Sequence, residues 1–348
     1  MSAGMVAALI TGANQLELRE FPIPTPADAG VVVDIAYCGL CGTDVHAYRT
    51  GRSYRPAICG HEWTGTISAI GKAVTGVSEG DRVVVGVPAP CGSCAACRRG
   101  QTLHCLTCVA FVHGRDPGAP PHGGFAPHLA VSVDRVIAAH PRLSDEVLAQ
   151  VEPVTVSLHA VNRSGLRAGD TAVVLGAGPV GLTTMQCALA AGAGAVLVIE
   201  PSGVRRAMAA ACGATAVAAP EAAADQVAEH TNGLGADVVY DCVGGGEALS
   251  SAVDLARRGG AVCMIGLADG PASISPGTWL RKEITVVAAL GYVHHEFETA
   301  MEMLADGRIQ VSALHTSTTR LEGLAETLAD LASGTSTQLK VLVRPTWK

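Results

Sequence analysis

The sequence predicts an α/β protein that combines a small β-barrel domain with a doubly wound parallel-sheet domain. Three observations carry this fold class. From Met5 to Val133, short β-rich runs such as VVVDIAYCGL alternate with Gly, Pro and Asp turns, which is typical of a barrel or sandwich. From Ala168 onward the pattern becomes strand, glycine turn and helix, repeated. After Gly291, two amphipathic helical patterns and the strand LKVLVRP follow, and we expect them to return to the first domain.

Each part of this prediction has its own pattern. In the first domain, WTGTISAIG and DRVVVGV continue the β-rich texture. In the second, Ala-rich helical stretches separate the apolar runs TAVVL, AVLVIE, ATAVAA, ADVVYDCV, AVCMIG and ITVVAA. Such alternation predicts a parallel sheet covered on both faces. We therefore expect the barrel domain over residues 1–154, completed by 290–348, and the sheet domain over 155–289.

Composition bounds the partners of the protein. The chain has 348 residues, of which 49% are hydrophobic, enough for two buried cores. A net charge of −7 with scattered basic residues and 3% aromatic residues argues against nucleic-acid binding. Residues 182–199 carry no charge, but Gly192 and Gly194 lie where a helix would give way to a strand, so we expect no membrane span. The N-terminus lacks an export signal, which predicts a cytoplasmic protein.

The first turn of the predicted sheet domain carries a dinucleotide-binding pattern. In VVLGAGPVGL, Gly176, Gly178 and Gly181 follow a buried strand and open a helix whose first turn holds Pro179 and Val180. The first glycine permits the tight turn, the second lets the backbone approach a pyrophosphate, and the third allows close packing of helix on strand. The phosphates would rest on the helix N-terminus. This context predicts a Rossmann fold.

Glu200 and Arg205 bear on which dinucleotide is bound. Glu200 ends the second strand, where an acidic side chain accepts hydrogen bonds from the adenosine ribose and repels a 2′-phosphate. Arg205 could pair with such a phosphate, stack on the adenine, or lie on the solvated face of its helix. The pattern favours NAD over NADP.

Twelve cysteines in a cytoplasmic chain point to metal ligation or core thiols before disulfides. Four of them, Cys91, Cys94, Cys97 and Cys105, fall in the short stretch CGSCAACRRGQTLHC. A tetrahedral set of four thiolates leaves no position for water or substrate, so zinc bound here would be structural. An iron-sulfur cluster would favour a shorter last gap, and a set of free core thiols would not fit the polar segment RRGQTLH.

A catalytic metal needs three protein ligands and an open position, and the candidates lie in three other segments. Cys41 lies in CGLCGTDVH, His61 and Glu62 in CGHEW, and Glu152 in VEPVTVSLHA. Singly, each has an ordinary structural alternative. Consecutive strand residues point to opposite faces, so simultaneous ligation by His61 and Glu62 requires a bend in the chain.

Taken together, these motifs resemble the zinc-dependent medium-chain dehydrogenase/reductase family, the alcohol dehydrogenase superfamily, over essentially the whole chain. GHEWTGTISAIGKAV is similar to its zinc signature, CGLCGTDVH to its first zinc-ligand region, the four-cysteine loop to its structural lobe, and GAGPVG with Glu200 to its coenzyme fold. The resemblance implies a GroES-like catalytic barrel, a Rossmann domain, one catalytic and one structural zinc, and NAD. It implies a catalytic zinc held by Cys41, His61 and Glu152, with Glu62 as the weakest ligand.

The same resemblance assigns further roles. Glu152 in this position is similar to the polyol branch, which includes sorbitol, threonine and butanediol dehydrogenases. Asp44 is expected to orient His61, or alternatively to cap a helix, while Thr43 and His46 resemble the two ends of the family's proton relay. The nicotinamide end is expected against Val243, Ile265 and Leu267. A homo-oligomer, dimer or tetramer, is also implied.

Three functions follow from these observations. The first is an NAD- and zinc-dependent dehydrogenase of a small secondary alcohol, diol or polyol, or the reductase of the matching ketone. The second is a quinone or enoyl reductase of the same fold that uses no catalytic zinc, against which the retention of Cys41, His61 and Glu152 argues. The third is a non-catalytic protein that binds the cofactor, which the pair Thr43 and His46 disfavours.

Overall fold

The computed structural model describes residues 4–51, 59–114, 120–268 and 270–346. The chain divides into two compact units. The first comprises Met1–Glu152, Val293–Ala305 and Val311–Lys348, and the second comprises Pro153–Tyr292 and Asp306–Gln310. We predicted domain boundaries at 154/155 and 289/290, and these boundaries stay a prediction.

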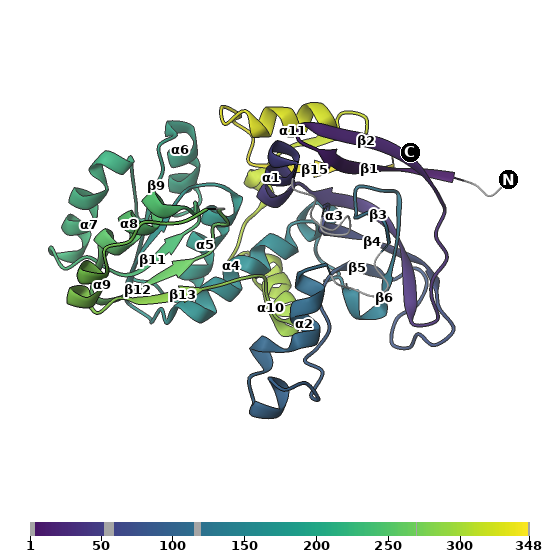
Figure 1. The fold of residues 1–348 in the computed structure, drawn as a ribbon, viewed down its shortest axis with the longest axis horizontal. Coiled ribbons are helices and arrows are strands. Elements are labelled where there is room, and N and C mark those ends of the chain that lie inside the picture. Colours follow the sequence, from purple (N-terminus) through teal and green to yellow (C-terminus); the bar gives the residue numbers. More distant parts are fainter. Residues whose placement is uncertain (1–3, 52–58, 115–119, 269, 347–348) are drawn as a thin grey trace. The chain divides into compact units, whose positions relative to one another are not determined.

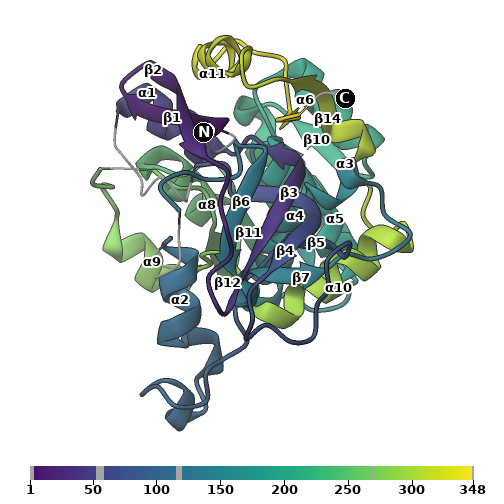
Figure 2. The same cartoon turned by 90° about the vertical axis from the view of Figure 1, so that its right-hand side faces the viewer.

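The first unit is built on a seven-stranded, largely antiparallel sheet. Strands follow the order β14-β15-β3-β4-β5-β7, and β6 pairs with β3. Figure 2 shows β3, β4, β5, β6 and β7 of this sheet. Their bounds are β3 Gly30–Gly39, β4 Glu62–Ile70, β5 Arg82–Val85, β6 His128–Ser132, β7 Val136–Ala138, β14 His315–Thr319 and β15 Lys340–Val343. The runs VVVDIAYCGL, WTGTISAIG and DRVVVGV correspond to β3, β4 and β5. Strand β14, which pairs in parallel with β15, was not predicted from the sequence.

The core of the first unit includes alternate residues of β3. Val31, Val33 and Ile35 alternate along β3 and are buried against Trp63 and Ile67 of β4, as the two-residue period of a strand requires. The hairpin of β1 (Gly4–Gly12) and β2 (Gln15–Pro22) forms a separate two-stranded sheet. The expected return of the C-terminal segment to the first domain is seen in β15, which pairs antiparallel with the end of β3.

Helices of the first unit are mostly short. They are α1 Gly42–Thr50, α2 Leu106–Val112, α3 Asp145–Leu148, α10 His294–Ala305 and α11 Leu324–Ala332, with 3-10 turns at Cys97–Arg99, Thr102–His104, Val133–Arg135 and Ser312–Leu314. Helix α4, Val151–Ser164, begins at the end of the first unit and continues into the second. Leu324 and Leu328 of α11 join the same core cluster as Ala47 and Tyr48 of α1, which fixes α1 against the barrel.

The second unit contains a six-stranded, fully parallel sheet with the order β10-β9-β8-β11-β12-β13. Its strands are β8 Thr171–Leu175, β9 Ala195–Ile199, β10 Ala216–Ala218, β11 Ala236–Asp241, β12 Ala256–Met264 and β13 Thr285–Ala288. Its further helices are α5 Pro179–Ala190, α6 Gly203–Ala211, α7 Ala223–Thr231, α8 Gly246–Leu255 and α9 Pro276–Lys282, with a 3-10 turn at Pro220–Ala222. Figure 1 shows helices on both sides of this sheet. The predicted α/β class is therefore confirmed.

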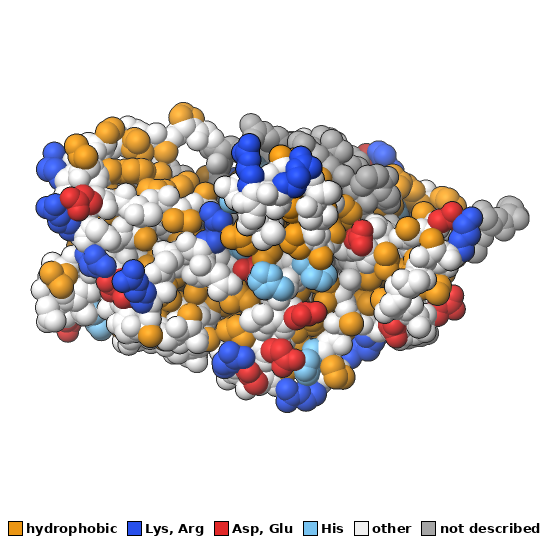
Figure 3. Space-filling model, turned by 90° about the horizontal axis from the view of Figure 1, so that it is seen from below, with side chains coloured by type: hydrophobic (Ala, Val, Ile, Leu, Met, Phe, Trp, Pro, Cys, Tyr) orange, Lys and Arg blue, Asp and Glu red, His pale blue; other side chains and the backbone are white. Residues whose placement is uncertain are grey.

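Strand order in this sheet reverses between β8 and β11, which is the position where doubly wound folds generally bind ligands. The uncharged stretch 182–199 is divided between α5 and β9. In the part of the chain that the structure describes, no helix is long and apolar enough to cross a bilayer. On the face shown in Figure 3, the described basic side chains are scattered among acidic and apolar ones.

Candidate functional site

Cys41 lies at the N-cap of α1, two residues after the end of β3, with the extended backbone that helix caps adopt (φ −95°, ψ 155°). Asp44, three residues later, is completely buried. One of its carboxylate oxygens accepts the N–H of Cys41 at 2.9 Å, and the other accepts the N–H of Gly60 at 3.0 Å. Asp44 therefore ties the segment of Cys41 to the segment of His61. Burial raises the pKa of Asp44, while the charge of His61 opposes this shift.

The bend that joint ligation by His61 and Glu62 requires is made at Gly60. This residue has a φ of 72°, which few side-chain-bearing residues adopt, and a Cβ there would approach the backbone nitrogen of Phe125 at 2.8 Å. His61 precedes β4, and Glu62 is its first residue. Because the turn falls immediately before the strand, the two neighbouring side chains are directed to the same place.

Cys41, His61 and Glu62 form one potential metal-ligand group. One sulfur, one imidazole nitrogen and one carboxylate oxygen all lie within 4.8 Å of one another. Burial alone would favour the neutral imidazole of His61. The thiolate of Cys41, which accepts a hydrogen bond from His61, and the carboxylate of Glu152 outweigh the effect of burial. They hold the pKa of His61 well above its usual value. A pocket so rich in negative charge, with sulfur, nitrogen and oxygen donors, fits Zn²⁺.

Glu152 lies in the first turn of α4 and is 6% exposed. It is outside the compact group of three, although its charge raises the pKa of both His61 and Lys340. Its ligation of zinc stays a prediction.

Lys340 is a member of this neighbourhood that sequence reasoning missed. Its ammonium lies 2.9 and 2.6 Å from the two carboxylate oxygens of Glu62 and donates to the carbonyl of Leu40 at 3.1 Å. Both side chains are almost completely buried, at 2% and 1% exposure. The available signal was a lysine in the otherwise apolar strand LKVLVRP, because a buried strand admits a charge only when it is paired.

Thr43 and His46 lie one turn apart on α1, and both are half-buried. Their positions three residues apart place them on the same side of the helix. Because Cys41 is the N-cap of α1, all three residues belong to one short element and its cap. Their roles in proton transfer stay predictions.

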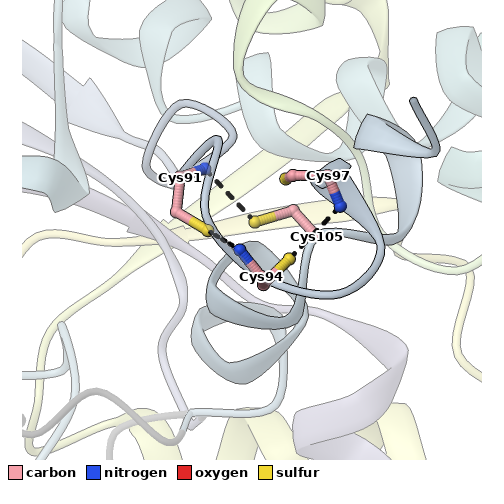
Figure 4. A group of neighbouring side chains, drawn as sticks. All are labelled: Cys91, Cys94, Cys97 and Cys105. Carbon is pink, nitrogen blue, oxygen red and sulfur yellow. Dashed lines mark hydrogen bonds between the residues drawn. The ribbon is translucent and has the colours of Figure 1, made fainter. Parts of the chain in front are cut away.

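The four cysteines of the predicted structural lobe converge (Figure 4). Their sulfur atoms lie within 4.8 Å of one another. Backbone N–H groups of Cys94, Cys97 and Cys91 each donate to a sulfur of the set at 3.4 Å. Hydrogen bonds from the Ser93 backbone and the Thr107 side chain lower the pKa of Cys91 to about 5, whereas burial raises that of Cys97 to about 12.

Such backbone donors stabilise thiolates, and four convergent sulfurs fit a closed zinc site. Cys108 lies nearby but is not a member of the group. Its thiol donates to the carbonyl of Pro88 at 3.1 Å, and burial raises its pKa to about 12.

The glycine turn of the second unit has the geometry that a dinucleotide requires. Gly176 has a φ of 89°, and its N–H donates to the carbonyl of Ile199 at 2.8 Å. A Cβ on Gly181 would overlap the carbonyl oxygen of Gly176, so the third glycine is needed for close packing. A Cβ on Gly178, the N-cap of α5, would meet nothing within 4 Å. That open cradle at the helix N-terminus, with Pro179 and Val180 in the first turn, fits a pyrophosphate.

Glu200 is buried beside this turn. One of its carboxylate oxygens accepts the N–H of Ala177 at 2.8 Å, and the other accepts the N–H of Ser202 at 2.8 Å. The carboxylate therefore organises the turn itself as well as lying at the end of β9. Arg205, in the first turn of α6, is half-buried, while Arg206 binds the carbonyls of Glu200 and Pro201.

Apolar side chains lie at the carboxyl ends of the next two strands. Val243 is 57% exposed, Leu267 is 63% exposed and Ile265 is half-buried. Asp241, at the end of β11, accepts the N–H groups of Val243 and Gly244, which fixes this turn. Exposed apolar groups at strand ends are consistent with contact to a planar ring, and this role stays a prediction.

Comparison with known proteins places these features in one family. Residues 27–141 match the alcohol dehydrogenase GroES-like domain, and residues 179–306 match the zinc-binding dehydrogenase family. The chain is 31% identical to sorbitol dehydrogenase of Bacillus subtilis over 350 residues, which covers 98% of this chain and 97% of that protein.

Solved structures agree with this likeness. A crystal structure of 2R,3R-butanediol dehydrogenase from Bacillus subtilis is similar with a TM-score of 0.84 and 28% identity, over 98% of this chain and 100% of that one. A zinc-binding dehydrogenase from Sinorhizobium meliloti bound to NADP is similar with a TM-score of 0.85 and 29% identity, over 99% of this chain and 100% of that one. The chain thus belongs to the zinc-dependent medium-chain dehydrogenase/reductase family, the alcohol dehydrogenase superfamily, and its expected GroES-like and Rossmann architecture is confirmed.

Proposed function

We propose that this enzyme transfers a hydride between a small secondary alcohol, diol or polyol, or the matching ketone, and NAD, with one catalytic zinc. The observation that carries the proposal is the group of Cys41, His61 and Glu62 within 4.8 Å in a chain that also carries the dinucleotide turn. Relatives named sorbitol dehydrogenase and butanediol dehydrogenase support a polyhydroxylated or secondary-alcohol substrate.

When bound, Zn²⁺ supplies Lewis acidity that lowers the pKa of a substrate hydroxyl, and NAD supplies the hydride acceptor. Cys41, His61 and Glu152 would hold the metal. Asp44 keeps the first two of these segments in register through its hydrogen bonds to the N–H groups of Cys41 and Gly60. Such supporting contacts orient ligands in metal sites.

Thr43 and His46 would move the proton that the substrate hydroxyl loses. The Thr43 hydroxyl, two residues after Cys41, can accept this proton while donating its own. The imidazole of His46, one helical turn further, can accept a proton at one ring nitrogen and donate one from the other. Their shared side of α1 supports this assignment.

NAD is the preferred cofactor in this proposal. Glu200 supports the preference, because a buried carboxylate at the end of β9 disfavours a nearby phosphate dianion. Arg205 would then contact the adenine or solvent. A structurally similar dehydrogenase binds NADP, so the preference is a property to be measured on this chain.

The function is tested by following NADH absorbance with a panel of diols, polyols and amino alcohols. Cys41→Ser and His61→Ala should remove turnover, because each deletes a zinc ligand. Cys212→Ser is the matched control, since Cys212 caps α6 in the second unit and belongs to neither ligand group. A strong chelator should abolish the activity, and added zinc should restore it.

Other outcomes would favour the alternatives. Turnover of quinones or enoyl substrates that survives both chelation and Cys41→Ser would identify a zinc-independent reductase. NADH binding without turnover of any alcohol or ketone would indicate a non-catalytic cofactor-binding protein. Either result would contradict the proposal.

A homo-oligomer and a cytoplasmic location also belong to this proposal. Strand β13 forms one end of the six-stranded sheet, and Leu280 and Leu290 near it are 79% and 65% exposed, which supports self-association through this region. Light scattering would measure the mass in solution and distinguish a dimer from a tetramer. A mass equal to that of one chain would contradict the proposed homo-oligomer. The cysteine-rich composition, with thiols as zinc ligands, supports a reducing compartment.

A further inference from the structure

The buried ion pair of Lys340 and Glu62 lies across three adjacent strands. β3 is hydrogen-bonded to β15 on one side and to β4 on the other. Glu62 on β4 is opposite Gly39 on β3, and Leu40 donates its N–H to the carbonyl of Val341 on β15 at 2.9 Å. The register therefore brings Lys340 beside the residue that precedes the ligand Cys41.

Gly39 leaves the path open between the two charges. A Cβ added there would collide with the carboxylate and the Cβ of Glu62. The Glu62 side chain thus passes over a strand position that has no side chain and reaches Lys340 on the far neighbour. This crossing directs both carboxylate oxygens to one ammonium at 2.9 and 2.6 Å.

The charges of the neighbourhood explain why such a pair is useful. Cys41, Glu62 and Glu152 together carry three negative charges when ionised, one more than Zn²⁺ neutralises. Asp44 is a further anion, and two backbone N–H groups bind it. The Lys340 ammonium, 2.9 and 2.6 Å from the two carboxylate oxygens of Glu62, places a balancing positive charge among these anions.

We propose that Lys340 is a positioning residue of the catalytic metal site, which holds Glu62 beside the ligand set and out of the position that a substrate oxygen needs. This inference rests on the proposed function. Glu62 lies close enough to Cys41 and His61 to bind a shared ion, yet both its oxygens are bound by the ammonium. A catalytic zinc site requires one open position, and a free carboxylate at this distance would compete for it.

Cobalt substitution tests the inference, because the visible d–d bands of Co²⁺ are strong in four-coordinate sites and weaken when a fifth ligand binds. The four-cysteine lobe would also take cobalt, so the spectrum of Cys41→Ser protein is subtracted. Lys340→Met should weaken the remaining bands and lower kcat, because Glu62 becomes free to bind the metal. Lys282→Met is the matched control, since the Lys282 ammonium binds three backbone carbonyls in the second unit.

Lys340→Met leaves Glu62 buried without its partner and can fail to fold, so two further variants keep the test decisive. The double variant Lys340→Met with Glu62→Gln removes both charges and should restore the wild-type band intensity. Gly39→Ala displaces the Glu62 carboxylate without changing either charge and should weaken the bands as Lys340→Met does.

Unchanged bands in Lys340→Met would overturn the inference, because a released Glu62 would then not compete for the metal. Weakened bands in the double variant would also overturn it, because the loss of intensity would then not come from the Glu62 carboxylate. Failure of the proposed function looks different. In that case wild-type protein would show no cobalt absorption beyond that of Cys41→Ser.

Discussion

Asp44 illustrates how one buried carboxylate can organise two separate segments. Its carboxylate accepts hydrogen bonds from the backbone N–H groups of Cys41 and Gly60, which are 19 positions apart in the chain. Neither N–H group is part of a helix or strand ladder, so loss of the Asp44 carboxylate would remove the hydrogen-bond acceptor of both. The geometry of Cys41 and His61 therefore depends on a residue that is not itself a ligand.

Asp44→Asn should weaken zinc binding about 10- to 100-fold, because the amide offers only one acceptor to the two N–H groups. We also expect a loss of about 1–3 kcal/mol in the free energy of unfolding. Competition with a chelator and urea denaturation measure the two effects. Asp34→Asn is the control, since Asp34 binds Ser68 and His128 away from the ligand group. Unaltered zinc affinity in Asp44→Asn would contradict this role.

Glu200→Gln should reduce the discrimination between the two cofactors. The substitution keeps the size of the side chain and one acceptor for the turn, but it removes the charge that repels a 2′-phosphate. We expect the ratio of kcat/KM for NAD over NADP to fall at least about tenfold, a difference of about 1.4 kcal/mol. Glu221→Gln, on an exposed 3-10 turn, should leave the ratio as it is. An unchanged ratio in Glu200→Gln would assign the preference to other residues.

At the scale of elements, two glycines near the turn between β8 and α5 serve different purposes. Gly178 has an ordinary φ of −74° and space for a side chain, whereas Gly181 has none. The fold itself therefore does not require a glycine at position 178, and only a bound molecule would require its small size. The second is required by the packing of α5 on β8.

Gly178→Ala should keep the stability of the protein within about 0.5 kcal/mol and yet weaken NADH binding at least about tenfold, since the methyl group fills the phosphate cradle. Gly181→Ala should cost about 1–3 kcal/mol through overpacking against Gly176. Isothermal titration and urea denaturation check the two variants. Wild-type NADH affinity in Gly178→Ala would show that the pyrophosphate lies elsewhere.

The four-cysteine lobe is an element whose stability depends on a metal. Cys97→Ser should lower the zinc content from about two to about one per chain and expose the lobe to proteolysis, because a three-ligand remnant binds zinc weakly. Cys108→Ser should retain both zinc ions, since its thiol binds the Pro88 carbonyl instead. Metal analysis by mass spectrometry gives the stoichiometry. Two zinc ions in Cys97→Ser would exclude this lobe as a zinc site.

Elements of the second unit were predictable because buried parallel strands are continuous apolar runs between glycine turns. All six predicted runs correspond to strands of one sheet, although β12 begins already at Ala256. In the first unit, β14 has exposed polar positions and carries no such signal. Motif spacing identified the cysteine lobe and the segment of His61. It could not identify the pairing of Glu62 with Lys340, because these residues are 278 positions apart and meet only through strand register.

At the scale of the whole molecule, the chemistry is divided between two units of one chain. Candidate metal ligands and proton-transfer residues belong to the first unit, and the dinucleotide turn belongs to the second. The chain then returns to the first unit, where β15 completes the sheet and contributes Lys340. The C-terminal segment is therefore part of the environment of the metal site.

The most direct test of the account is a zinc-edge anomalous diffraction map of crystals of the purified enzyme. We expect two peaks per chain, one enclosed by Cys91, Cys94, Cys97 and Cys105 and one in contact with Cys41 and His61. A single peak in the cysteine lobe, with nothing between Cys41 and His61 in enzyme that still oxidises alcohols, would contradict a zinc-dependent mechanism.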